Sequence, residues 1–131
     1  MQKTFVRGTW QQKRAFSPAV IVTGETKTIY VAGHTGQTAE DGSPIADFDA
    51  QCRRTFRNIE VTLAEAGAKL SDLVTMTVFL TDVRYTTPMT EIRQEVFGKD
   101  FPASAALTVT GFAQPNILIE IQGIAVVKAV S

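Results

Sequence analysis

The sequence predicts one α+β domain in which two helices cover a single face of a mixed β-sheet. A chain of 131 residues is long enough to bury a hydrophobic core without disulfides or a metal. With 44% hydrophobic and 20% charged residues, its composition is that of a folded protein rather than a disordered one. Apolar residues recur at helical spacing in two segments and alternate with polar residues elsewhere, which gives the element order ββαβαββ. No repeat or linker interrupts residues 1–131, so we expect one domain.

Two strands begin the predicted fold, at residues 19–23 and 27–32, and both are rich in β-branched residues. The three residues between them have the length and composition of a hairpin turn. A helix follows, with Asp47 as its N-cap and Gly67 as its terminator. Its apolar residues recur at helical spacing: Phe48, Cys52, Phe56, Ile59 and Leu63.

The second half of the chain predicts a strand, a helix and two further strands. Residues 74–80 alternate with a period of two, which predicts a strand with its aliphatic row toward the helices. Thr87 and Pro88 predict the start of a second helix that extends to about Phe97, because threonine caps helices and proline is tolerated at the first position. Strands at residues 104–110 and 117–127 complete the sheet.

Alternation also predicts which side chains point away from the helices. One row per strand is expected on this uncovered face: Thr28, Tyr30, Ala32 and His34; Thr75, Thr77, Phe79 and Thr81; Ser104, Ala106, Thr108 and Thr110; Leu118, Glu120, Gln122, Ile124 and Val126. The face combines threonines with large apolar side chains, and contiguous apolar patches commonly mark interaction sites. We therefore expect self-association to cover it.

Glu120 is the candidate catalytic residue. It is the one acidic residue in the apolar terminal strand, between Ile119 and Ile121. A carboxylate among apolar neighbours carries a desolvation cost, which a hydrogen bond, a cation or a function must compensate. A structural hydrogen bond or a solvated charge on an edge strand fits the pattern equally well.

His34 is a second candidate, in the string Gly33-His34-Thr35-Gly36 at the end of a strand. Glycines let the backbone approach a ligand closely, and an imidazole exchanges a proton near neutral pH. The alternative is a loop histidine with a local hydrogen bond. The glycines match neither the phosphate-binding loop nor the dinucleotide fingerprint.

Charge and side-chain content restrict the function classes. Lys+Arg and Asp+Glu number 13 each, so no excess of positive charge favours nucleic acid or a membrane surface. Arg53, Arg54 and Arg57 lack an aromatic platform and fit a solvated helix face better than an RNA site. One histidine and one cysteine cannot supply a typical zinc site, although carboxylates alone could hold a hard cation weakly. No serine or cysteine has the context of a nucleophile elbow.

The expected location is the cytoplasm. Cys52 is the only cysteine, so no internal disulfide is possible, and the first residues lack the apolar run of a secretory signal. The longest apolar runs are too short to cross a bilayer, so no membrane partner is expected.

Six local strings together carry a family resemblance over nearly the whole chain. They are Ile29-Tyr30-Val31-Ala32-Gly33-His34, the helix from Asp47 through Asn58 to Ala66-Gly67, Val78-Phe79-Leu80-Thr81-Asp82, Glu95-Val96-Phe97-Gly98, Phe101-Pro102-Ala103 and Ile119-Glu120-Ile121. With them the sequence resembles the Rid/YjgF family of small proteins. The resemblance implies a chorismate-mutase-like fold, a homotrimer whose sheets form a central barrel, and ligand clefts between neighbouring subunits.

The resemblance also implies an activity and a set of site residues. In well-known members the clefts hydrolyse reactive enamines and imines to a 2-oxo acid and ammonia without a cofactor. Glu120 matches the family's glutamate, and a carboxylate that orients water and shuttles a proton suits this reaction. The implied substrate-binding positions are Ala19, Ala32, His34, Thr35, Phe97, Ser104 and Ala106.

Ser104 departs from the family pattern. The family's deaminases follow Pro-Ala with an arginine that grips the substrate carboxylate, whereas here Ser104 follows Pro102-Ala103. A hydrogen bond to a charged group is worth about 1.5 to 3 kcal/mol, so its loss weakens an amino-acid-derived ligand by about one to two powers of ten. The usual imino-acid substrate is therefore not expected. The sequence leaves open whether Arg93, Arg7 or another cation replaces the arginine.

Two further departures from the family pattern also count against the usual imino-acid substrate. Ala19 stands after proline where the family commonly has a tyrosine, and Ala106 is the small residue of the pocket. The leading hypothesis is a trimer that hydrolyses a small imine or enamine, and the alternative is a trimer that binds or regulates through a small molecule. RNA cleavage, a third family association, is disfavoured by the neutral charge.

Overall fold

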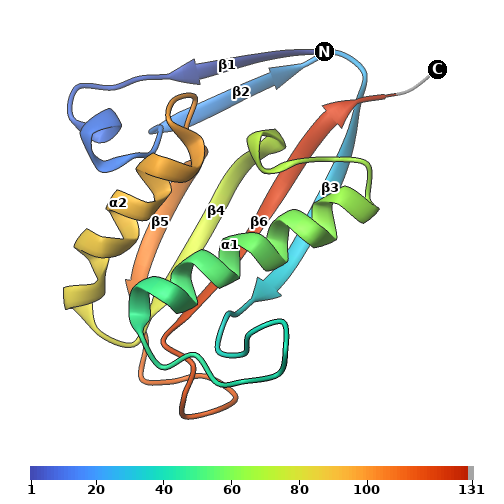
Figure 1. Cartoon of the computed structure of the whole chain (residues 1–131). Coiled ribbons are helices and arrows are strands. Elements are labelled where there is room, and N and C mark those ends of the chain that lie inside the picture. Colours follow the sequence, from blue (N-terminus) through green and yellow to red (C-terminus); the bar gives the residue numbers. More distant parts are fainter. Residues whose placement is uncertain (130–131) are drawn as a thin grey trace.

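The computed structural model describes residues 1–129 as a mixed α+β fold, with two helices packed on one face of a sheet (Figure 1). The strands are β1 (Gln2–Val6), β2 (Ala19–Thr23), β3 (Thr26–His34), β4 (Leu73–Leu80), β5 (Ala103–Thr108) and β6 (Ile119–Lys128). The helices are α1 (Phe48–Glu65) and α2 (Thr86–Phe97), with short 3₁₀ helices η1 (Gln11–Arg14), η2 (Leu70–Asp72) and η3 (Val83–Tyr85). Within this described part of the chain, no helix has the length and apolar character needed to span a membrane.

The main sheet has the strand order β3-β6-β4-β5. Strand β6 runs antiparallel to both of its neighbours, whereas β4 and β5 run parallel and are joined through α2, so the sheet is mixed. Strand β6, which carries Glu120, is therefore an inner strand. The predicted fold class of two helices on one face of a mixed sheet is confirmed at this level.

The predicted order ββαβαββ is wrong at its start, because a further strand, β1, precedes the others. Strand β1 pairs with β2, and the two form a separate antiparallel ribbon. The predicted hairpin between β2 and β3 is also wrong, since β3 pairs with β6 instead. Alternation in β1 is hard to recognise because Lys3 shares its inner row with Phe5 and binds Asp72.

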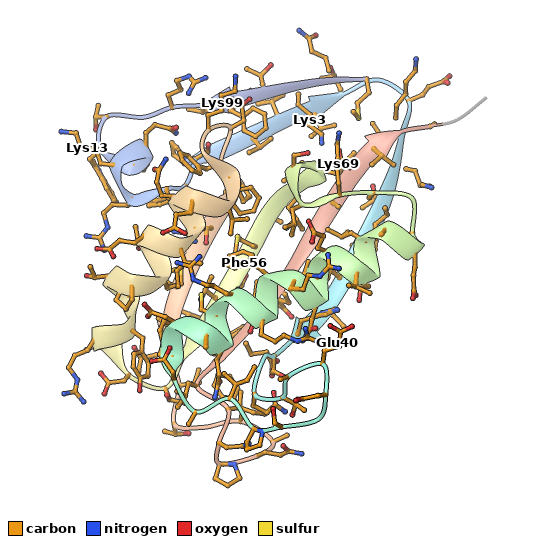
Figure 2. The ribbon with its side chains drawn as sticks, viewed as in Figure 1. Lys3, Lys13, Glu40, Phe56, Lys69 and Lys99 are labelled. Carbon is orange, nitrogen blue, oxygen red and sulfur yellow. The ribbon has the colours of Figure 1, made fainter. Side chains whose placement is uncertain are left out.

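Helix α1 forms as predicted. The Asp47 side chain accepts a hydrogen bond from the Ala50 N–H at 2.9 Å, which caps the helix. The predicted apolar row of α1 is buried against the sheet, as are Met76, Val78 and Leu80 of β4. Phe56 of α1, labelled in Figure 2, lies between the helices and the sheet. Its ring packs edge-on against Phe97 of α2, with ring centroids 6.1 Å apart.

Helix α2 starts earlier than predicted. Thr86 is its first residue, so Pro88 is the third and the predicted Thr87 cap is wrong. The 3₁₀ helix η3 runs directly into α2, and Asp82 caps that segment by accepting from the Arg84 N–H at 2.9 Å. Proline is tolerated within the first turn because the N–H groups there have no intrahelical partner.

His34 does not lie on the uncovered face, contrary to the prediction. A β-bulge between Val31 and His34 places His34 opposite Ile121, a fully buried residue on the helix side. One extra residue in a strand moves every following side chain to the other face of the sheet. His34 consequently points toward α1.

The predicted row of Ser104 and Ala106 is also on the wrong face. These residues pair with Met76 and Val78, whose side chains are buried under the helices. The sequence of β5 has small residues on both faces, so alternation cannot tell which row faces the core. Ala105 and Leu107 occupy the uncovered face instead.

Candidate functional site

Glu120 is half-buried on the uncovered face of the sheet, between the fully buried Ile119 and Ile121. Its carboxylate lies against the backbone of Gly33, where a Cβ atom would overlap it. Among residues 1–129, no side-chain hydrogen bond or ion pair reaches this carboxylate. The described residues therefore give Glu120 no structural hydrogen bond, and its carboxylate oxygens can accept hydrogen bonds from water or a ligand.

A depression of about 390 Å³ occupies the same face of the sheet. It is lined by Tyr30, Val31, Ala32, Thr75, Met76, Thr77, Gln122, Gly123 and Ile124. Ala32, a predicted substrate-binding residue, lies here. Tyr30 is 79% exposed, which is high for a large aromatic side chain in the middle of a strand.

A second hollow of about 160 Å³ lies on the opposite side of the sheet, between β5, α2 and the segment that contains η1. It is lined by Trp10, Arg14, Phe16, Thr86, Met89, Thr90, Arg93, Ser104 and Ala106. Ser104 and Ala106 are thus together, on the face opposite to the one that the sequence predicted. Glu120 is not with them, because the sheet separates the two faces.

Arg93 forms the buried wall of this hollow and is only 3% exposed. Its Nη1 donates to Ser104 Oγ at 2.8 Å and its Nη2 donates to the Arg14 carbonyl at 3.1 Å, while its buried Nε has no partner in the described structure. Burial lowers the pKa of the Arg93 guanidinium to about 10. Of the two arginines that the sequence left open, Arg93 is the one beside Ser104. Arg7 lies elsewhere and pairs with Asp100 at 3.5 Å.

His34 and Thr35 organise the junction between β3 and α1. His34 Nδ1 lies 2.7 Å from the Ala32 carbonyl, and its Nε2 lies 2.8 Å from the Thr62 hydroxyl. The Thr35 carbonyl accepts from Asn58 Nδ2 at 2.8 Å. Both ring nitrogens of His34 are thus occupied within the chain, which favours the local hydrogen-bonding role over proton exchange with a ligand.

The remaining predicted substrate-binding residues lie apart from both hollows. Ala19 is exposed in β2, opposite Val6 of β1. Phe97 packs on Phe56 and lines a third hollow of about 250 Å³ beneath β1. A single chain therefore distributes the predicted site over separate regions.

Trp10 and Phe16 are site residues that sequence reasoning missed. Their rings meet edge-on, with centroids 5.6 Å apart, and Phe16 lies 5.9 Å from the Arg93 guanidinium carbon. Trp10 remains 57% exposed at the rim. The only available signal was that the single tryptophan falls in a segment with no regular pattern.

The structure offers little for metal or thiol chemistry. Across residues 1–129, no three side chains of the His, Cys, Asp or Glu type come together as a metal-binding group. Cys52 is fully buried in the core, and burial raises the pKa of its thiol to about 12. A thiol in that state is a poor nucleophile.

Comparison with known proteins identifies relatives over most of the chain. The sequence model of a family described as Endoribonuclease L-PSP matches residues 10–127. A RutC family protein from Pyrococcus abyssi is 38% identical over 98 residues, which cover 74% of this chain and 76% of that protein. The human 2-iminobutanoate/2-iminopropanoate deaminase is 30% identical over 112 residues, which cover 85% of this chain and 79% of that protein.

The fold also matches a solved structure. The crystal structure of YyfB from Yersinia pestis, a Rid family protein of unknown function, superposes with a TM-score of 0.82. The superposition covers 95% of this chain and 98% of that one, at 23% sequence identity. This similarity establishes a shared fold.

Proposed function

Because the chain belongs to the Rid/YjgF family, we propose that it hydrolyses a small reactive imine or enamine to a carbonyl compound and ammonia. The observation that carries this proposal is the half-buried carboxylate of Glu120, which lies over the bare backbone of Gly33 without a partner in residues 1–129. A relative that covers most of the chain is named as a deaminase of 2-imino acids, which supports the reaction class.

Glu120 is the proposed general base. It accepts a proton from a water molecule as that water adds to the carbon of the protonated C=N bond, which gives an aminol. Glu120 returns this proton to the nitrogen of the aminol, which leaves as ammonia, while the hydroxyl group gives its own proton to Glu120 and becomes the carbonyl. An enamine enters the same sequence after it takes up a proton at carbon. The reaction needs no cofactor, because water is the only co-reactant.

The proposed site is assembled from neighbouring copies of the chain. Glu120 lies on the uncovered face of the sheet, whereas Ser104 and Ala106 lie on the helix side. A single cleft that uses all three residues must take them from different chains. A homotrimer with the uncovered faces packed into a central barrel meets this need and also covers the exposed Tyr30.

The proposed substrate is anchored differently from the usual imino acid, because Ser104 stands where the family's deaminases have an arginine on the strand. A serine hydroxyl makes a neutral hydrogen bond, which is about half as strong as one from a guanidinium. Strand β5 of this chain therefore supplies no cation to the cleft.

Glu120→Gln tests the proposal. The variant keeps the shape and burial of the side chain and removes the base, so kcat for ammonia release from a panel of freshly generated imines should fall about 100-fold or more. Glu40→Gln, in the exposed loop between β3 and α1, is the matched control and should keep full activity (Figure 2). Undiminished ammonia release by Glu120→Gln would refute the catalytic role.

A binding or regulatory trimer is the second candidate, and Ser104 in the arginine's place is the observation that favours it. Such a protein would bind a stable small metabolite and convert none of the imines. Calorimetry on wild type combined with the ammonia assay separates the two functions. Binding without turnover supports the regulatory trimer, and turnover that depends on Glu120 supports the hydrolase.

A further inference from the structure

The guanidinium of Arg93 is buried without a counterion. Only 3% of the residue is exposed, and its two hydrogen bonds go to neutral oxygens, Ser104 Oγ and the Arg14 carbonyl. No carboxylate lies within ion-pair distance of Arg93 in residues 1–129. A charge in the interior is costly unless an opposite charge and hydrogen bonds compensate it. Residues 1–129 supply two hydrogen bonds to Arg93 and no opposite charge.

The hollow beside Arg93 has the properties of an anion site. Its lining contains two arginines, Arg93 and Arg14, and no acidic side chain. Burial lowers the pKa of Arg93 to about 10, and the positive charge of Arg14 acts in the same direction. An anion bound here would offset both effects.

Arg93 and Ser104 are in direct contact in the lining of the hollow. The buried Nε–H has no partner in the described structure, and the Ser104 hydroxyl accepts from Nη1, which leaves its own proton free to donate. Trp10 and Phe16 also line the hollow, and the ring centroid of Phe16 lies 5.9 Å from the Arg93 guanidinium carbon. The volume of about 160 Å³ is enough for a compact organic acid.

We propose that Arg93 is the carboxylate-binding residue of the cleft, and that helix α2 supplies the cation that strand β5 lacks. This inference rests on the proposed function for the identity of its ligand, a small imine or enamine that carries a carboxylate and a short apolar body. Ser104 then positions the guanidinium and contributes one hydroxyl donor, and Trp10 and Phe16 contact the apolar part.

The test is calorimetric binding of pyruvate and of its uncharged methyl ester to the full-length protein. Wild type should bind pyruvate at least tenfold more tightly than the ester, because only the carboxylate of pyruvate can make a hydrogen bond between charged groups with Arg93. Arg93→Met should weaken pyruvate binding at least tenfold and abolish the preference. Arg53→Met, which removes an exposed arginine that pairs with Glu95, is the matched control and should behave as wild type.

Three results would overturn the inference. The first is that wild type binds both compounds equally or binds neither. The second is that Arg93→Met binds pyruvate as tightly as wild type does. The third is that inorganic phosphate displaces pyruvate so readily that the site is a general anion site. Thermal unfolding checks that each variant is folded. If Arg93→Met does not fold, Arg93→Lys takes its place in the test. The lysine variant should keep a preference for pyruvate over the ester.

Glu120→Gln separates this inference from the proposed function. That variant should bind pyruvate at least as tightly as wild type, because it removes a negative charge from the cleft, and it should release ammonia from imines about 100-fold or more slowly. If it continues to release ammonia, the proposed catalytic role fails while the binding result for Arg93 stands. If Arg93→Met binds normally and Glu120→Gln is inactive, the carboxylate site fails while the hydrolase stands.

Discussion

Gly33 controls the position of the Glu120 carboxylate. A Cβ atom at residue 33 would lie 2.9 Å from Glu120 Cδ and 3.2 Å from its Cγ, so the carboxylate must shift in Gly33→Ala. Displacement of a catalytic group by about 1 Å costs up to about 100-fold in rate, so we expect kcat for ammonia release to fall about 10- to 100-fold. Steady-state kinetics with thermal unfolding checks this. The melting temperature should change little, since the clash involves the end of a flexible side chain.

The control for Gly33→Ala is Gly111→Ala, where an added Cβ atom meets nothing within 4 Å. It should keep wild-type rate and stability. Full activity of Gly33→Ala would mean that the observed place of the Glu120 carboxylate does not matter for the reaction.

Moving the positive charge from α2 to β5 should restore carboxylate binding that Arg93→Met has lost. In the double variant Arg93→Met/Ser104→Arg, the new guanidinium starts from the residue that Arg93 Nη1 now contacts at 2.8 Å. We expect its pyruvate affinity to return to within about tenfold of wild type, measured by calorimetry. Ser104→Arg alone should be less stable than wild type, because two buried guanidiniums would repel each other. A double variant that binds as weakly as Arg93→Met contradicts the shared position.

Cys52 should resist thiol reagents as long as the protein is folded. Burial raises the pKa of its thiol to about 12, so at pH 8 the thiolate is roughly one part in ten thousand, against about a quarter for a free cysteine. Labelling with a chromogenic disulfide at pH 8 should be negligible in the native protein and complete in denaturant. Rapid labelling of the native protein would show that α1 opens readily from the sheet.

Gln51 joins three elements at the start of α1. Its side chain is fully buried and donates to the Ile45 carbonyl at 2.7 Å and to the Asn116 carbonyl at 2.8 Å, while its Oε1 accepts from the Leu118 N–H at 3.0 Å. These bonds connect α1 to the loops before α1 and before β6. The position of β6, and with it Glu120, depends on this connection.

Gln51→Leu should lower the free energy of unfolding by about 3 kcal/mol, because it removes three part-buried hydrogen bonds that are worth about 1 kcal/mol each. Chemical denaturation measures this loss. Gln94→Leu, on the exposed face of α2 with one local bond to the Gly98 carbonyl, is the control and should change stability by less than about 1 kcal/mol. Equal effects of the two variants would refute a central role for Gln51.

At the level of elements, the sequence predicts what periodicity can carry. Helix α1 has a regular apolar row and a capping Asp47, and both are confirmed. The face of β5 is not predictable, because it follows from the pairing of Ser104 with Met76 on another strand. The bulge before His34 likewise depends on contacts between strands and reverses the predicted face. Local patterns predict elements, whereas partners distant in the sequence determine which face a side chain occupies.

At the level of the whole molecule, the predicted site residues are dispersed: Glu120 lies on one face of the main sheet, whereas Ser104 and Ala106 lie on the other. Glu120 could be proposed from the sequence because a carboxylate stands out in an apolar strand. Trp10 and Phe16 could not, because their place beside Arg93 depends on the fold of the amino-terminal segment over α2. The same division makes self-association a requirement of the proposed reaction, which a change far from the chemistry can test.

Tyr30→Asp should dissociate the assembly and abolish activity together. Tyr30 is 79% exposed on the uncovered face and lines its depression with Thr77 and Gln122. A carboxylate at this position would be solvated in a free chain and buried in the proposed trimer. Burial of an unpaired charge costs several kcal/mol, so we expect the dissociation constant of the assembly to rise about 100-fold or more. Sedimentation over a range of concentrations measures this, and ammonia release should fall in parallel with dissociation. Val83→Asp, at a residue 69% exposed beside α2, should leave both unchanged. A wild-type protein that sediments as a monomer while it turns over imines would contradict the shared site, since one chain keeps Glu120 and Ser104 on opposite faces of its sheet.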